Sequence, residues 1–197
     1  MRRIVSTVAV IATLTLTGCA GTVKNMKEVA DDASAIKPRQ DESIVVFMRP
    51  SGLGFAIQSS VFEIKNDAPT LVGIVAAKSK VAHRVPAGKY LYMVVGENAD
   101  FMEADLAPNK TYYAYISPRM GMWKARFILE PKRSSDLNTA EFISDYNECR
   151  LVETTAESNA WMADNLNSIL AKRNEYYKDW QKQAAEERQQ LFPQDGR

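Results

Sequence analysis

Cysteine and histidine are scarce in this 197-residue chain, which has two cysteines and one histidine. Transition-metal sites usually draw several ligands from these two residue types. We therefore predict no metal site and no bound cofactor.

Recognisable catalytic motifs are lacking as well. His83 shares one side of a predicted strand with Val81 and Val85, so we expect a packing role, because no oriented partner for acid–base catalysis is suggested. The Gly52-Leu53-Gly54 segment has no Gly-Lys-Ser/Thr after it and is no phosphate loop. We predict no catalytic residue and expect a protein that is not an enzyme.

Neither sign of charge dominates, since 25 basic residues face 24 acidic ones. No basic patch favours nucleic acid as a partner. After residue 16 no apolar run approaches the about 20 residues that a membrane-spanning helix needs.

The start of the chain has the layout of a secretory signal. Arg2 and Arg3 precede an apolar run over residues 4–16, which is too short to cross a bilayer. Leu16-Thr17-Gly18-Cys19 follows and resembles the lipobox of bacterial lipoproteins at all four positions. Residues 1–18 are therefore predicted to be a signal peptide that is cleaved before Cys19.

The lipobox resemblance implies that Cys19 carries diacylglycerol on its sulfur and an acyl chain on its new amino terminus. Two or more chains anchor a protein stably. Ala20, where an aspartate would favour retention in the inner membrane, implies an outer-membrane lipoprotein that faces the periplasm. Cys149 is then left without a disulfide partner, and we expect a buried, inert thiol.

Residues 19–42 are polar and mixed in charge, which predicts a flexible tether behind the lipidated N-terminus. About 22 residues of coil span roughly 25 Å, enough to hold the domain away from the membrane. A short helix over residues 23–33 is an alternative within this segment.

From residue 43 onward, short apolar runs alternate with Gly, Pro, Asn and Asp. We expect strands over residues 43–49, 57–64, 70–76, 80–85, 89–96, 101–106, 110–117 and 123–130. This spacing favours an antiparallel β-sandwich over residues 43–152. The predicted fold class is therefore mainly β, with about eight strands and a long C-terminal helix.

Residues 45–50 (VVFMRP), 84–90 (RVPAGKY) and 106–113 (LAPNKTYY) carry a second resemblance. In this order they are similar to an uncharacterised family of bacterial lipoprotein domains related to the PEGA-like β-sandwiches. The resemblance covers about residues 43–152. It implies a fold and no activity.

The C-terminal part is predicted to be helical. A short helix is expected over residues 137–146, and Thr154 with Glu157 fits a capping box at the start of a helical segment over residues 153–192. Its second half has little to bury, so we expect it to project into solvent as a docking arm. A disordered tail over residues 193–197 is expected to follow.

Two surfaces are candidates for binding, and their residues are Met120, Met122, Trp123, Tyr176, Tyr177 and Trp180. The first three lie in a loop whose soft apolar side chains suit adaptable contacts, or else cap the sandwich. The last three lie where the packed and projecting halves of the helix would meet.

Five strand tyrosines would suit sugars if they lay on an open face, with packing as the alternative: Tyr90, Tyr92, Tyr112, Tyr113 and Tyr115. Together the features predict a lipid-anchored, periplasm-facing envelope lipoprotein, a non-enzymatic interaction or accessory module with an envelope protein as partner. A binding protein for a glycan or another small envelope ligand is the alternative. A hydrolase with an unrecognised site is the third interpretation.

Overall fold

The computed structural model describes residues 23–31, 36–120 and 125–197. In this part of the chain eleven strands form two sheets. The six-stranded sheet has the order β1 (Met26–Glu28), β10 (Arg150–Thr154), β5 (Ser79–Pro86), β2 (Glu42–Arg49), β8 (Lys110–Met120) and β9 (Ala125–Pro131). The five-stranded sheet has the order β11 (Gln190–Leu191), β7 (Ala99–Leu106), β6 (Gly88–Val95), β3 (Ser59–Lys65) and β4 (Ala68–Val75).

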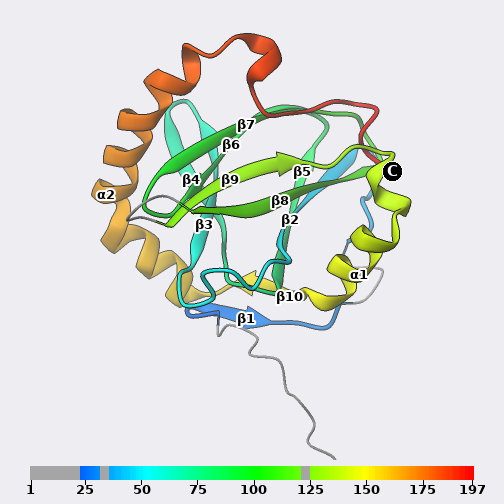
Figure 1. The fold of residues 1–197 in the computed structure, drawn as a ribbon, viewed down its shortest axis with the longest axis horizontal. Helices are drawn as coiled ribbons and strands as arrows, with labels where there is room; N and C mark the ends of the chain where they lie inside the picture. The colour runs from blue at the N-terminus through cyan, green and yellow to red at the C-terminus, as the bar shows by residue number, and fades with distance from the viewer. Residues whose placement is uncertain (1–22, 32–35, 121–124) are drawn as a thin grey trace, which may run out of the picture.

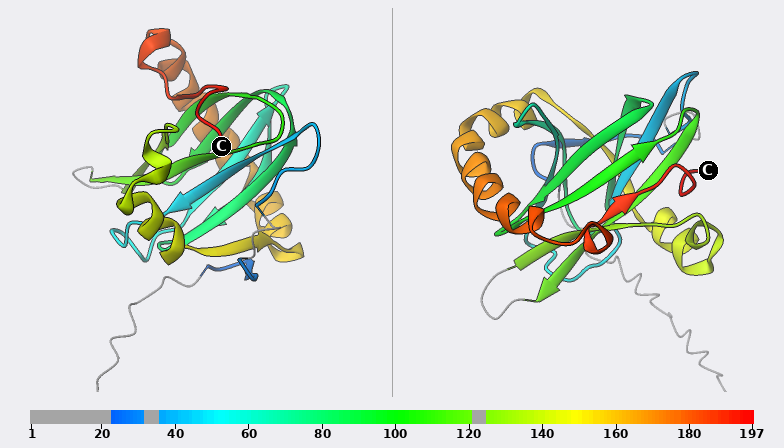
Figure 2. Two further views of the ribbon diagram at one scale, coloured as in Figure 1. Left: turned by 90° about the vertical axis from the view of Figure 1, so that its right-hand side faces the viewer. Right: turned by 90° about the horizontal axis from the view of Figure 1, so that it is seen from above.

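The two sheets pack face to face, and a helix covers the outer face of each (Figure 1, Figure 2). Alternation along β2 produces this layering, because Phe47 enters the core between the sheets while Met48 packs on the opposite face. Helix α1 (Ala140–Glu148) covers Met48 through Phe142, and the short helix η1 (Asp136–Asn138) precedes it. Helix α2 (Ala156–Gln181) covers the five-stranded sheet through Ile169 and Trp180.

The prediction of a mainly β fold with a long C-terminal helix is confirmed, and each of the eight predicted strands overlaps an observed one. The prediction of purely antiparallel sheets is wrong. Strand β2 pairs in parallel with β8, β10 with β5, and β11 with β7. The spacing of turns shows where strands lie in the sequence but not which strands pair. Strands β3 to β7 lie between β2 and β8 in the chain, yet β8 pairs with β2 in the sheet.

Three strands were not predicted: β1, β10 and β11. They contain three, five and two residues, too few for an apolar alternation to stand out. The described residues therefore hold eleven strands rather than about eight.

The described part of the expected tether, residues 19–42, is packed on the domain rather than flexible. Met26–Glu28 forms β1 against β10, so the alternative of a helix over residues 23–33 is also wrong for this stretch. Ile36 is 7% exposed and belongs to the cluster beneath α1. Asp31 forms an ion pair with Lys80, whose side chain is fully buried. Composition alone suggested a solvated linker because the partners of these residues are distant in sequence.

Helix α2 begins and ends differently from the prediction. Its capping box uses Thr155 and Ser158, one residue beyond the predicted pair. The helix ends at Gln181, and the chain continues through the short helix η2 (Ala185–Glu187) into β11. The projecting arm is thus wrong, because buried Trp180 fixes the end of the helix and buried Leu191 enters the core between the sheets.

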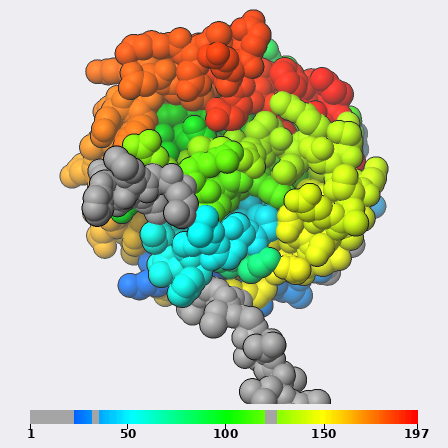
Figure 3. Space-filling view, in the orientation of Figure 1, coloured from blue at the N-terminus to red at the C-terminus, as the bar shows by residue number. Residues whose placement is uncertain are grey.

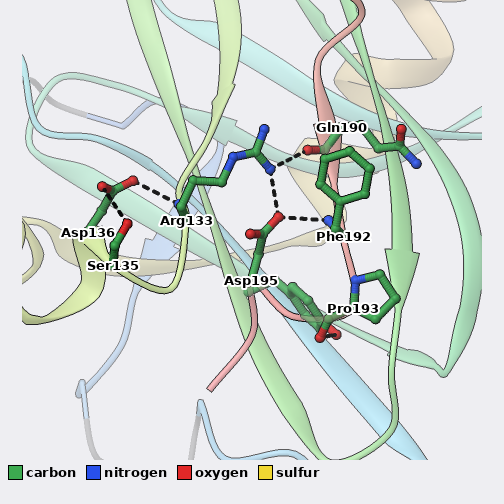
Figure 4. Close-up of polar contacts among 8 residues, drawn as sticks. Arg133, Ser135, Asp136, Gln190, Phe192, Pro193 and Asp195 are labelled. Carbon is green, nitrogen blue, oxygen red and sulfur yellow. Dashed lines mark hydrogen bonds and ion pairs between the residues drawn. The ribbon is translucent and has the colours of Figure 1, made fainter. Parts of the chain in front are cut away.

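The tail over residues 193–197 is ordered by polar contacts rather than disordered (Figure 4). Arg133 Nη1 donates a hydrogen bond to Asp195 Oδ2 at 2.6 Å. Thr111 and Arg197 exchange two backbone hydrogen bonds of 2.8 and 3.1 Å. The polar composition of the tail suggested solvation, whereas its polar groups pair with the strands beside it.

Candidate interaction surface

The exposed apolar side chains concentrate in one loop between β2 and β3, residues 50–58, which we name the apolar loop. Leu53 is 51% exposed, Phe55 60% and Ile57 37%. Only two other large hydrophobic side chains of the described residues are exposed, Ile143 and Phe192. The loop lies on the molecular surface, in cyan in Figure 3. Exposed apolar clusters of this kind mark contact surfaces.

Sequence reasoning missed this surface. The strand predicted over residues 57–64 begins at Ser59 instead, which leaves Ile57 in the loop. The available signal was an apolar residue at every second position, Leu53, Phe55 and Ile57, inside a loop that contains two glycines.

Arg49, the last residue of β2, fixes the shape of the apolar loop. Its fully buried guanidinium donates hydrogen bonds to the carbonyl oxygens of Ile57 (2.5 Å), Leu53 (2.7 Å) and Gly54 (2.8 Å). Its central carbon lies 4.6 Å from the ring centroid of Phe127 in β9. Burial lowers the pKa of Arg49 to about 10, so the group remains charged at neutral pH. The carbonyls therefore face inward toward a cation.

Gly54 is suited to its place in this loop. Its φ of 65° is a left-handed conformation that glycine adopts without a steric penalty. A Cβ at this position would lie in ordinary contact with Arg49 Nη2, at 3.5 Å, so it is the backbone conformation and not the space that favours glycine. The left-handed conformation of this glycine thus allows its carbonyl to turn toward Arg49.

Contacts connect the base of the apolar loop with the N-terminal strand. The Arg49 carbonyl accepts a hydrogen bond from Lys78 N at 2.8 Å, and the Lys78 carbonyl accepts one from Arg150 N at 3.0 Å. Arg150 Nη1 pairs with Glu28 in β1 at 2.8 Å. The apolar loop and β1 therefore lie at the same end of the sandwich, the lower end in Figure 1 and in the left view of Figure 2.

Several predicted site residues lie outside the described residues, namely Cys19, Met122 and Trp123. Met120 is the last residue of β8, where it pairs with Ala125 of β9, and its side chain is also outside the description. Lipidation at Cys19 and binding by the Met–Trp loop therefore stay predictions.

The predicted contact residues of the helix belong to its packed face. Trp180 is 4% exposed, and its ring centroid lies 5.7 Å from that of Phe101 and 5.6 Å from that of Tyr177. Tyr176 and Tyr177 are half-buried in the same cluster. These aromatic rings hold α2 on the sheet rather than face a partner from a projecting arm.

The strand tyrosines form no exposed aromatic row. Four of the five are buried, namely Tyr92, Tyr112, Tyr113 and Tyr115. Tyr90 is half-buried and, with Tyr177, lines a shallow groove of about 430 Å³ on the five-stranded sheet. Asp105 and Lys89 also line this groove, with Asp105 Oδ2 3.8 Å from Lys89 Nζ. The groove therefore combines aromatic and charged groups.

His83 has a partner that the sequence did not suggest. Its Nε2 lies 3.0 Å from Oε2 of Glu63, which belongs to the opposite sheet. Both side chains are mostly buried, and the His83 ring lies 5.8 Å from that of Tyr92. The Tyr92 hydroxyl is buried and has no hydrogen-bond partner among the described residues. This cluster links the two sheets.

Cys149 is 2% exposed, as the prediction of a buried thiol requires. Burial raises the pKa of Cys149 to about 12, so the reactive thiolate is rare at neutral pH.

Among the side chains that the structure describes, no group of three or more His, Cys, Asp or Glu residues could hold a metal ion. Within the same residues, no helix is long and apolar enough to cross a membrane.

No protein-family model matches the chain, and a search of the curated proteins found no match.

Proposed function

We propose that this chain is a lipid-anchored envelope lipoprotein that faces the periplasm and acts as a non-enzymatic interaction or accessory module. The lipobox at residues 16–19 supports the anchor, and Ala20 supports the outer membrane as its location. The relation to PEGA-like lipoprotein domains, implied by residues 45–50, 84–90 and 106–113, is part of the same proposal.

The observation that carries the interaction role is the apolar loop, with its exposed side chains and its buried Arg49. Leu53 and Phe55 are more than half exposed, although burying such side chains is normally favourable by about 1.5–3 kcal/mol each. Arg49 fixes the loop backbone before any contact forms, which lowers the entropy cost of binding. A surface of this kind favours contact with another component of the envelope.

The anchor and the contact surface are tested separately. Cys19→Ser should leave an unprocessed precursor that takes up no labelled palmitate, and persistent labelling would refute the lipoprotein assignment.

A photocrosslinking amino acid at Phe55 should form adducts in whole cells. The same group at Ile143, which is 49% exposed on α1, serves as the matched control and should form few. Equal crosslinking at both positions would argue against the apolar loop as the contact surface.

The groove beside Tyr90 and Tyr177 favours a second candidate function, binding of a glycan or another small envelope ligand. Aromatic rings beside charged groups are suited to sugar rings and their hydroxyls. Peptidoglycan fragments should then bind the wild-type chain and bind Tyr90→Ala more weakly. Indistinguishable binding by both proteins would remove this candidate.

A further inference from the structure

The lipid-bearing residue is close in the chain to the first strand. Six residues lie between Cys19 and Met26, and the seven residue steps that join these two positions span at most about 25 Å when fully extended. The segment before β1 is itself attached to the domain, because the Asn25 carbonyl accepts a hydrogen bond from Thr155 Oγ1 at 3.2 Å. A flexible coil of the same length typically spans about 15 Å, so the anchor proposed above holds β1 nearer to the bilayer than the tether of about 22 residues expected from the sequence would.

The apolar loop lies at the end of the sandwich from which this short connection starts. The contacts from Arg49 through Lys78 and Arg150 to Glu28 join the loop base to β1. A domain attached through β1 can thus turn the apolar loop toward the membrane surface without releasing any described contact.

The chemistry of the apolar loop suits a lipid surface. Residues 50–58 (PSGLGFAIQ) include no charged side chain, so the loop itself carries no ion that would be desolvated on entry into the headgroup region. Leucine and phenylalanine are among the side chains that insert at the boundary between headgroups and acyl chains, and isoleucine is apolar as well.

The backbone of the loop is prepared for a region with little water. Unpaired backbone polar groups are costly there. The carbonyl oxygens of Leu53, Gly54 and Ile57 already accept hydrogen bonds from Arg49. The Leu53 and Ile57 amides donate to Ser51 Oγ and to the Gly54 carbonyl, at 3.1 and 2.9 Å. These five backbone groups keep their hydrogen bonds when water leaves the loop.

From these observations we infer that the apolar loop inserts its side chains into the phospholipid bilayer that holds the Cys19 lipid. The inference rests on the proposed lipid anchor and names the component that the loop contacts. The contact orients the domain, so the end with η2 points away from the membrane, toward the top of Figure 1.

The test uses the full mature, lipidated chain with Cys149→Ala as background. A fluorescent label is attached at Phe55→Cys, or at Leu53→Cys as a second position in the loop. Glu186→Cys, exposed in η2, is the matched control. The proteins are placed on vesicles of phosphatidylethanolamine and phosphatidylglycerol, with or without a nitroxide on the acyl chains. We expect the nitroxide lipid to quench the loop labels about twofold or more and to leave the control label unchanged.

Labels at positions 53 and 55 that stay unquenched, on protein that floats with the vesicles, would overturn bilayer contact while the lipid anchor stands. If these labels are shielded from solvent in native membranes but not in protein-free vesicles, bilayer contact is also overturned, in favour of a protein partner. A chain that takes up no palmitate and does not float would refute the anchor, and the inference with it.

Discussion

Asp195 Oδ2 accepts a hydrogen bond from Arg133 Nη1 at 2.6 Å, which joins the C-terminal residues to the segment after β9 (Figure 4). The same carboxylate oxygen accepts from the Phe192 amide at 2.8 Å, and Arg133 also donates to the Gln190 carbonyl at 2.8 Å. Asp195 is 4% exposed. This pair therefore fixes β11 and the residues after it against the sandwich.

Asp195→Ala should lower the free energy of unfolding by about 1–3 kcal/mol, because it leaves the Phe192 amide and one Arg133 donor unpaired. The effect stays within this range because the Arg133 side chain is 43% exposed and keeps access to water. Urea denaturation measures it. Asp179→Ala is the matched control, since its side chain is 78% exposed beside Lys182, and it should leave the free energy of unfolding nearly unchanged. Equal stability of the two variants would contradict the role of Asp195.

The Lys80–Asp31 pair predicts a non-additive pair of substitutions. Lys80 Nζ donates to the Tyr146 carbonyl at 2.8 Å and lies 3.5 Å from the centroid of the Tyr146 ring. Asp31→Ala leaves this buried ammonium without its carboxylate and should lower the free energy of unfolding by about 2–4 kcal/mol. The double variant Asp31→Ala with Lys80→Met should be more stable than Asp31→Ala alone, because no buried charge remains. If the losses in free energy of unfolding of the two single variants sum to that of the double variant, the two residues do not interact.

Lys80 also shows which contacts could not be predicted from the sequence. The strands were predictable because alternating apolar residues and turn residues are local patterns. A lysine beside Val81 is typical of a solvent-facing strand position, and nothing local indicates a carboxylate at Asp31. The packed N-terminal segment and the packed tail were missed for this reason, since both are held by partners distant in sequence.

The candidate surface was missed for a related reason. Leu53 and Phe55 are apolar, and apolar residues are expected inside a fold. Their exposure follows from Arg49, whose side chain binds the loop carbonyls and so directs the loop side chains outward. A strand-terminal arginine carries no local sign of such a role. Lipidation at Cys19, by contrast, is predicted from the local motif alone.

Tyr92→Phe should stabilise the chain by about 1 kcal/mol, because it removes a buried hydroxyl that lacks a partner among the described residues. Burial raises the pKa of this tyrosine well above its usual value, with a further contribution from Glu63. Its ring, 4.9 Å from that of Phe47, is retained in the variant. Thermal unfolding measures the change.

Tyr112→Phe is the matched control with the opposite sign. The Tyr112 hydroxyl accepts from the Ala107 amide at 2.8 Å and donates to the Pro193 carbonyl at 3.2 Å. Its removal should destabilise the chain by about 1 kcal/mol. Destabilisation of similar size in both variants would indicate that the Tyr92 hydroxyl has a hydrogen-bond partner after all.

Asp100 of β7 and Asn98, which directly precedes this strand, complete the free edge of β9. Asn98 exchanges two hydrogen bonds with the Phe127 backbone, at 2.9 and 3.0 Å, and Asp100 Oδ2 accepts from Leu129 N at 2.8 Å. Burial raises the pKa of Asp100 from 3.8 to about 6, although the amides of Leu129 and Phe101 lower it in part. The folded state therefore binds this proton more tightly than the unfolded chain does.

The sign of the resulting pH dependence follows from that difference. Between its unfolded and folded pKa values, Asp100 is protonated mainly in the folded state, so its contribution to stability is lost as pH rises through this window. The shift corresponds to about 3 kcal/mol in total. Asp100→Asn removes the titration, so its stability relative to wild type should increase by about that amount from about pH 4 to about pH 7.

Asp179→Asn should show a dependence of the opposite sign, because its hydrogen bond with Lys182 lowers the pKa of Asp179. Because all other carboxyl groups are shared with wild type, their titration cancels in each difference. A difference between Asp100→Asn and wild type that does not change with pH would show that Asp100 titrates alike in the folded and unfolded chains.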